Sequence, residues 1–133
     1  MARFDGRRLG TWSLRLDAAY CLVLGVSVAS ASTPIAAVVS IPQPLIVATG
    51  IVVAVWAALV LWMLARLQLR SALRLLLGVN VLAALLIAAA SMAAVSELVA
   101  IAVIAIAIDV ALFAASQGIA ILRLDRTQRI ARA

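Results

Sequence analysis

Long apolar stretches, separated by short polar or proline-containing ones, dominate the sequence. A helix needs about 20 apolar residues to cross the hydrocarbon core of a bilayer. Four stretches reach that length and predict helices over residues about 12–32, 45–65, 72–94 and 97–122. Apolar and polar residues do not alternate along these stretches, as they would in the strands of a membrane β-barrel. The pattern therefore predicts an all-α integral membrane protein, with residues 1–133 forming a single transmembrane domain.

The connection between the first two predicted helices is itself apolar. Thr33-Pro34 resembles a helix N-cap followed by a proline at the first helical position. Residues 34–40 are therefore predicted to form a short segment lying along the membrane interface. Residues 41–44, Ile-Pro-Gln-Pro, cannot continue a helix, because each proline forces the residue before it toward extended geometry. Pro44 is well placed to open the second long helix.

Positive charge is confined to three places in the chain. All eleven cationic residues are arginines, and neither Lys nor His occurs; they are Arg3, Arg7, Arg8, Arg15, Arg66, Arg70, Arg74, Arg123, Arg126, Arg129 and Arg132. Arginine-rich flanks of membrane helices stay on the cytoplasmic side. Both termini and the loop over residues 66–74 are basic, whereas loops 33–44 and 95–96 hold no arginine. This predicts an antiparallel, up-down-up-down four-helix bundle in the cytoplasmic membrane, with both termini cytoplasmic.

The composition supports a membrane protein and narrows its partners. The chain is 68% hydrophobic and 12% charged, with a mean hydropathy of +1.25, whereas soluble domains carry about 25% charged residues. The net charge of +6 lies beside apolar runs, so anionic lipid headgroups are the expected partner and nucleic acid is not. One cysteine, Cys21, excludes an internal disulfide. With no His, a conventional zinc site lacks ligands, and no metal or cofactor is expected.

The N-terminal region also has features of a signal peptide. A basic start precedes an apolar run, and residues 29–31, Ala-Ser-Ala, resemble a cleavage site. The run after Asp17 is rich in Ala and Ser rather than Leu, and its removal would leave three spans. We therefore interpret it as a retained helix.

Asp109 is the strongest candidate for a functional residue. It falls near the predicted bilayer midplane, where ionisable side chains are costly and usually face the bundle interior or a water-filled cavity. A proton or cation site, or a polar contact for a ligand, is one interpretation. A carboxyl group that bonds a neighbouring helix and holds the bundle together is the other.

Further polar residues accompany Asp109 in the predicted spans. Asn80 and Gln117 each lie six residues from an arginine, so antiparallel neighbours would hold their amides at one depth and allow a direct bond. Gln117, Ser116 and Asp109 share one helical stripe, which could instead line an inward-opening half-cavity. Trp56 sits deep enough for its N–H to need a partner, such as Asp109 or a backbone carbonyl, and it could wall a ligand pocket.

Other positions are predicted to be structural. Asp17 lies near the cytoplasmic interface, where an ion pair with Arg15 or with an arginine of the central loop is expected. Cys21 is interpreted as a small buried hydrophobe. Small residues at four-residue spacing permit close contact between helices; they are Gly25 and Ala29 in the first predicted helix and Gly50, Ala54 and Ala58 in the second.

A family resemblance rests on three features: residues 15–17 (Arg-Leu-Asp) opening the first helix, residues 41–44 before the second, and Asn80 early in the third. With these the chain resembles small uncharacterised four-helix integral membrane proteins of actinobacterial type, and in size and topology it is similar to DoxX-like proteins. The resemblance implies four packed helices in the cytoplasmic membrane and carries over no catalytic residue.

The sequence contains no phosphate-binding glycine loop, no Ser/His/Asp set and no cysteine pair. The expected function is therefore non-enzymatic: an accessory or scaffold subunit that associates with itself or with another membrane protein. One alternative is a small proton- or cation-coupled carrier that uses Asp109. Another is a protein that binds lipid or an apolar small molecule near Trp56 and Asp109.

Overall fold

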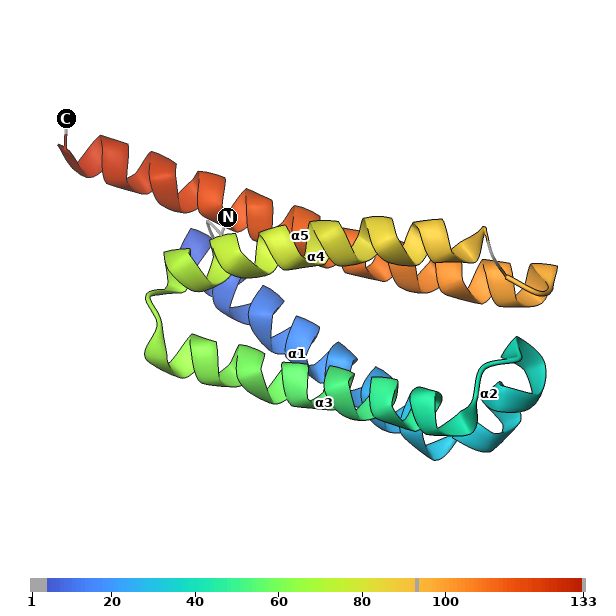
Figure 1. Cartoon of the computed structure of the whole chain (residues 1–133). Helices are drawn as coiled ribbons and strands as arrows, with labels where there is room; N and C mark the ends of the chain where they lie inside the picture. The colour runs from blue at the N-terminus through green and yellow to red at the C-terminus, as the bar shows by residue number, and fades with distance from the viewer. Residues whose placement is uncertain (1–4, 93, 133) are drawn as a thin grey trace.

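The computed structural model describes residues 5–92 and 94–132, which are helical along almost their whole length. The helices in this part of the chain are α1 (Gly6–Ser30), α2 (Ser32–Val39), α3 (Gln43–Arg66), α4 (Leu69–Ser91) and α5 (Glu97–Arg132) (Figure 1). α1, α3, α4 and α5 are each long and apolar enough to span a membrane. The prediction of an all-helical chain with four candidate spans is confirmed.

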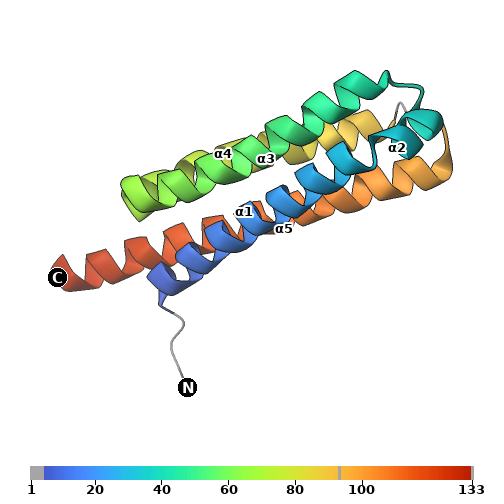
Figure 2. The same ribbon diagram turned by 90° about the horizontal axis from the view of Figure 1, so that it is seen from below.

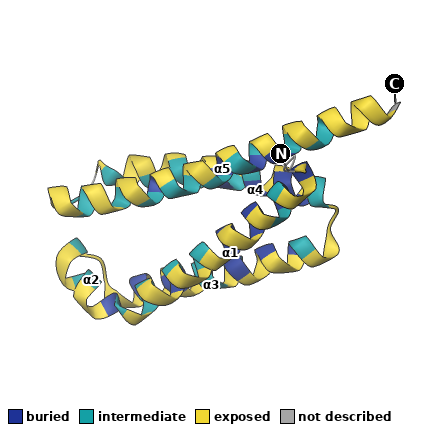
Figure 3. Ribbon diagram, turned by 180° about the vertical axis from the view of Figure 1, so that it is seen from behind, coloured by how far each residue is buried: buried dark blue, intermediate teal, exposed yellow. Residues whose placement is uncertain are grey.

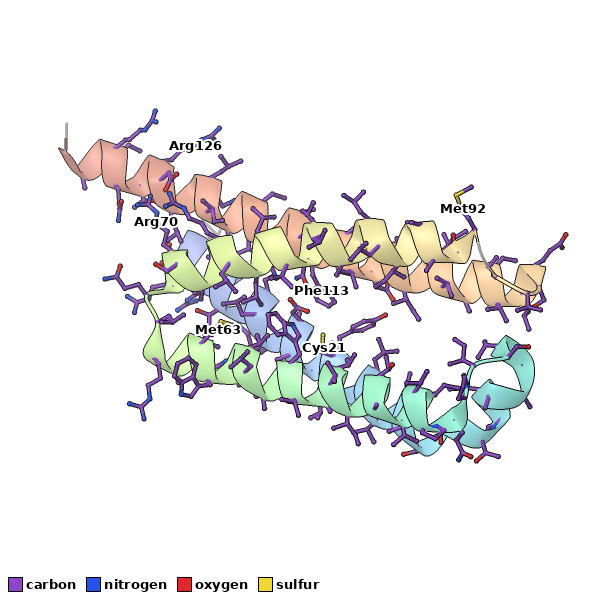
Figure 4. The ribbon with its side chains drawn as sticks, in the orientation of Figure 1. Cys21, Met63, Arg70, Met92, Phe113 and Arg126 are labelled. Atoms are coloured by element: carbon purple, nitrogen blue, oxygen red, sulfur yellow. The ribbon has the colours of Figure 1, made fainter. Side chains whose placement is uncertain are left out.

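The four long helices form two pairs. α1 packs along α3 and α4 packs along α5, and the pairs join mainly where α1 lies beside α5 (Figure 2). The start of α1, the end of α5 and the α3–α4 connection lie at one end of the molecule, whereas α2 lies at the other (Figure 1). The pairs approach each other at the end with the termini and diverge toward α2. Arg70 and Arg126 lie near the first end and Met92 at the opposite one (Figure 4).

α1 begins earlier than residue 12, the predicted start. The side chain of Asp5 accepts a hydrogen bond from the backbone N of Arg7, at 3.4 Å, and so caps a helix that starts at Gly6. An N-cap carboxylate satisfies one of the free N–H groups of the first turn. The start of the apolar run therefore shows where α1 becomes suited to lipid, whereas the helix itself begins earlier.

The predicted basic loop over residues 66–74 is mostly helical. α3 ends at Arg66 and α4 starts at Leu69, which places Arg70 and Arg74 on α4. α4 ends at Ser91, earlier than residue 94, and residue 93 lies outside the described part of the chain. The predicted loop is helical because charged residues limit the part of a helix that lies in lipid but do not end the helix itself.

α5 continues past residue 122, its predicted end, to Arg132, and it extends beyond the other helices (Figure 1). The sequence after Leu122 contains neither Pro nor Gly, the usual signals for a helix end. Asp125 on this extension forms an ion pair with Arg70 on α4. The predicted end again marked the limit of the apolar run.

The predicted interfacial segment 34–40 appears as the short helix α2. It ends at Val39, and the next residue, Ser40, has a left-handed φ of 53° that stops further helical hydrogen bonding. Gln43 Nε2 donates to Thr33 Oγ1 at 3.0 Å and so ties the start of α3 to the start of α2. Pro44 lies in the first turn of α3, as predicted.

The best-packed region lies at the end of the molecule that holds the termini. It is a cluster of buried apolar residues from all four long helices: Leu14, Ala18, Val60, Met63, Ala72, Leu73, Leu76 and Ala120. Elsewhere most side chains are exposed, including many Leu, Ile and Val (Figure 3). In water such a surface would drive association, whereas hydrocarbon solvates it, so the exposure agrees with four membrane spans.

α1 and α3 approach each other closely at two glycines. A Cβ added to Gly25 would lie 2.6 Å from the carbonyl oxygen of Gly50, and one added to Gly50 would lie 2.6 Å from the backbone N of Ala29. Only glycine lets two backbones meet at this distance. The predicted contact between small residues of the first two long helices is confirmed at these positions.

Candidate functional site

A carboxylate lies inside the bundle, hydrogen-bonded to two amides. Asp17 on α1 is 2% exposed. Its Oδ2 accepts hydrogen bonds from Asn80 Nδ2 of α4 at 2.6 Å and from Gln117 Nε2 of α5 at 2.9 Å. The Cys21 thiol is 3.6 Å from its Oδ1. We call Asp17, Asn80 and Gln117 the Asp17 network; it joins three helices through side chains alone.

The amide pair expected from the sequence is present. Asn80 Nδ2 lies 3.3 Å from Gln117 Oε1, and both residues are buried. The two amides also share Asp17, which the sequence did not place beside them. Because amide N–H groups stabilise a carboxylate that has lost its water, the network allows Asp17 to be buried without a cation.

The predicted ion pair between Arg15 and Asp17 is wrong. Arg15 is exposed, whereas the carboxylate oxygens of Asp17 bond Asn80, Gln117 and Cys21. Residues two apart on a helix do not face each other, since each residue turns the helix by about 100°. With Asp17 directed into the bundle, Arg15 must face outward.

A second polar group lies on the outside, between α1 and α5. The Tyr20 hydroxyl donates to Asp109 Oδ2 at 2.8 Å, and its ring packs against Phe113 with the centroids 5.5 Å apart. Nearer the termini, the hydroxyl oxygens of Ser13 and Ser116 are 2.6 Å apart. These residues line a surface groove of about 390 Å³, which we call the α1–α5 groove.

The stripe predicted on the fourth long helix is therefore divided. Asp109 and Ser116 line the α1–α5 groove, but Gln117 points inward to the Asp17 network. Neighbouring positions 116 and 117 differ by about 100° around the helix, which is enough to place them on different faces. The three residues do not line one cavity, and the expectation of a shared half-cavity is wrong.

Trp56 lines a cavity that is separate from the α1–α5 groove. A cavity of about 260 Å³ lies between the two helix pairs, with walls from α1, α3, α4 and α5 that include Trp56, Tyr20, Cys21 and Asn80. Figure 4 shows Cys21 on α1 between the pairs, near the middle of the bundle. Asp109 is absent from this lining and receives its hydrogen bond from Tyr20. The predicted association of Trp56 with Asp109 is not found.

Sequence reasoning missed Tyr20 and Ser13, which hold Asp109 and Ser116. Tyr20 was visible as a hydroxyl-bearing aromatic well inside an apolar run, where such a group needs a hydrogen-bond partner. Its pairing with Asp109 depends on how α1 lies against α5, which one helix pattern does not reveal. Ser13 carried no signal of its own.

The described residues contain no group of three His, Cys, Asp or Glu that could hold a metal ion. What the two polar groups can do is bond helices together and present a carboxylate, Asp109, at the surface between α1 and α5. No family model, curated protein or solved structure matches the chain. The likeness to DoxX-like proteins thus stays a prediction.

Proposed function

We propose that the chain is a multi-pass protein of the cytoplasmic membrane with antiparallel spans and both termini in the cytoplasm. The position of the charges supports this proposal. The described arginines belong to the first part of α1, the last part of α5 and the region of the α3–α4 connection. These three regions lie together at one end of the bundle. Positive residues remain on the cytoplasmic side during insertion.

Cysteine labelling tests this orientation. In a Cys21→Ser background, thiols introduced at exposed Ser71, Ser96 and Thr127 report both sides. An impermeant maleimide added to intact cells should label Ser96→Cys and spare the other two until the membrane is opened. Labelling of Ser71→Cys or Thr127→Cys in intact cells would overturn the orientation.

Within that membrane the chain acts as a non-enzymatic accessory or scaffold subunit. The Asp17 network supports this role by fixing the bundle that presents a docking surface, because its polar side chains bond three helices to one another. The contact between Ser13 and Ser116 adds a further link between α1 and α5. Interhelical hydrogen bonds of this kind fix the arrangement of a bundle.

A surface on which another helix could pack lies between α4 and α5, away from the α1–α5 groove. Small and apolar residues of α4 and α5 line a groove of about 410 Å³ there, among them Ala84, Ala111, Ala115 and Gly118. Gly78 on α4 has open space above it. Small residues let a second helix come close, which is how helices associate without a hydrophobic driving force in lipid.

Native mass spectrometry of gently solubilised protein tests the role. We expect a homo-oligomer or a stoichiometric membrane partner, and a clean monomer would contradict it. Ala115→Leu, which fills the groove, should reduce the complex. The matched control is Ala105→Leu, an equal change at an exposed position of α5 outside the groove lining.

A second candidate function is the binding of an apolar small molecule or lipid chain in the cavity beside Trp56. The supporting observation is a cavity of about 260 Å³ with mainly apolar walls and the Asn80 amide at its edge. A retained ligand should appear in the native mass spectrum and disappear in Ala83→Phe, which fills the cavity. Ala89→Phe, exposed and outside the lining, should keep it.

The carrier alternative receives less support from the geometry. Asp109 lines the α1–α5 groove, whereas a path through the bundle would pass between the helix pairs. Proton flux into liposomes that depends on Asp109, measured with an enclosed pH-sensitive dye, would favour it again.

A further inference from the structure

Asp109 presents a carboxylate to the outside of the bundle at mid-depth. It is twelve residues from Glu97, where α5 starts, and fourteen from Arg123, which are about 18 Å and about 21 Å along the helix. The side chain is half-buried, and Tyr20 donates to one of its oxygens. An ionisable residue at such depth in a membrane normally faces protein or water, since lipid solvates it poorly.

The α1–α5 groove that holds Asp109 opens toward the surroundings. Its rims carry Trp12 and Leu112, which are 60% and 62% exposed. Along α1 the groove extends from Leu9 to Tyr20, about 16 Å or three helical turns. A groove of this length between two helices matches the contact surface of a third helix packed against both.

Within the described part of the chain, no arginine lines the α1–α5 groove beside Asp109. The chain contains no Lys or His, and its arginines lie at 3–15, 66–74 and 123–132. Arg15 is the nearest along α1, about 7.5 Å from the level of Tyr20. Arg15 is exposed and does not line the groove. A second copy aligned in the same direction would hold its own Arg15 at that same level along α1 rather than opposite Asp109.

We infer that the α1–α5 groove docks a transmembrane helix of a different membrane protein, one that carries a Lys or Arg at mid-depth opposite Asp109. This inference rests on the accessory role proposed above and names the chemistry of the partner. The cation would satisfy the carboxylate, Tyr20 would hold the carboxylate in place, and the apolar rims would pack on the partner's helix.

A synthetic helix tests this inference without knowledge of the natural partner. The full chain, labelled with a fluorescent donor, is placed in phospholipid vesicles with an acceptor-labelled, Leu-rich transmembrane peptide bearing one central Lys. Otherwise identical peptides with a central Gln or Leu are the comparison. We expect the Lys peptide to associate at least about tenfold more tightly than the Leu peptide, as a difference of about 1.4 kcal/mol would give.

Variants assign the effect to Asp109. Asp109→Asn keeps the size of the side chain and should abolish the advantage of the Lys peptide. Glu97→Gln removes an equal charge from the exposed start of α5, outside the groove lining, and should leave it unchanged. Far-ultraviolet circular dichroism and the unfolding midpoint show that each variant is folded; if Asp109→Asn is not, Leu112→Trp, which obstructs the groove rim, replaces it.

Four results would overturn the inference. The first is equal binding of the three peptides, and the second is a Lys advantage that survives in Asp109→Asn and Leu112→Trp. The third is displacement of the Lys peptide by a long-chain alkylamine at equal concentration, which would assign the groove to an amphipathic amine. Self-association lost in Asp109→Asn would assign it to a second copy and also overturn it. None of these removes the accessory role, which fails only if native mass spectrometry shows a clean monomer.

Discussion

Asn80 Nδ2 lies 2.6 Å from Asp17 Oδ2, so that α4 bonds directly to α1 across the centre of the bundle. Both side chains are buried, and Gln117 of α5 completes the arrangement. α1 packs most extensively on α3 and only slightly on α4, so this bond joins the two helix pairs where they otherwise touch little. Its loss should therefore affect how the pairs hold together.

Asn80→Leu should destabilise the protein. The change keeps the approximate size but removes one donor from a buried carboxylate, which costs about 1–3 kcal/mol. The measurement is the midpoint of unfolding by sodium dodecyl sulfate in mixed micelles. Thr49→Val is the control, since the Thr49 hydroxyl bonds its own helix at Leu45 O, is exposed and should matter little. An unchanged midpoint for Asn80→Leu would show that the network does not stabilise the bundle.

Gly50→Ala should separate α1 from α3. The added methyl group would lie 2.6 Å from the backbone N of Ala29, so the helices must shift, at a cost of about 1–3 kcal/mol. Gly78→Ala is the matched control, because a Cβ added at Gly78 would have no atom of another helix within 4 Å. This change should stabilise α4 by up to about 1 kcal/mol. Equal effects of both changes on the unfolding midpoint would contradict the close contact.

Cysteines at positions 13 and 116 should form a disulfide. The hydroxyl oxygens of Ser13 and Ser116 are 2.6 Å apart, so the two side chains meet directly, as the two sulfur atoms of a disulfide must. In a Cys21→Ser background, mild oxidation should protect both thiols from maleimide, and a reductant should restore labelling. Cysteines at Ser13 and Ser91, on opposite ends of the bundle, should remain free; protection of that pair instead would refute the packing of α1 on α5.

Arg70→Gln should have only a small effect. The ion pair of Arg70 with Asp125 is about one-third exposed on both sides, at 33% and 35%, and such pairs contribute about 0–1 kcal/mol. The shift in unfolding midpoint should be smaller than for Asn80→Leu and should shrink further at high salt. A loss larger than that of Asn80→Leu would mean that the extension of α5 is more important to the fold than its exposure indicates.

The helices and one polar contact could be predicted from the sequence. The length of an apolar run is set by the thickness of the hydrocarbon core, so the sequence predicts the four candidate spans. Asn80 and Gln117 were paired because equal distances from the arginines place them at equal depth. Helix ends were less accurate, because lipid limits the apolar run while caps such as Asp5 limit the helix.

The surroundings of Asp17 could not be predicted from neighbouring charges. Arg15 suggested an ion pair, yet the rotation of α1 about its axis decides which residue faces inward, and that rotation is set by packing with α4 and α5. Tyr20 and Asp109 are 89 positions apart and meet only through the same packing. The sequence pattern of a single helix predicts how deep each residue lies along the bundle, but it predicts poorly how the helix is rotated about its own axis.

The 36 residues of α5 make it about 54 Å long, whereas the hydrocarbon layer is about 30 Å thick. About 24 Å of the helix must therefore lie outside the hydrocarbon, and the ten residues after Leu122, about 15 Å of it, point into the cell in the proposed orientation. A reporter joined to the end of this segment would be held at a set height above the membrane. Each residue inserted after Arg129, beyond the Arg70–Asp125 ion pair, would raise the reporter by about 1.5 Å and rotate it by about 100°, and the packing of the four helices would stay unchanged.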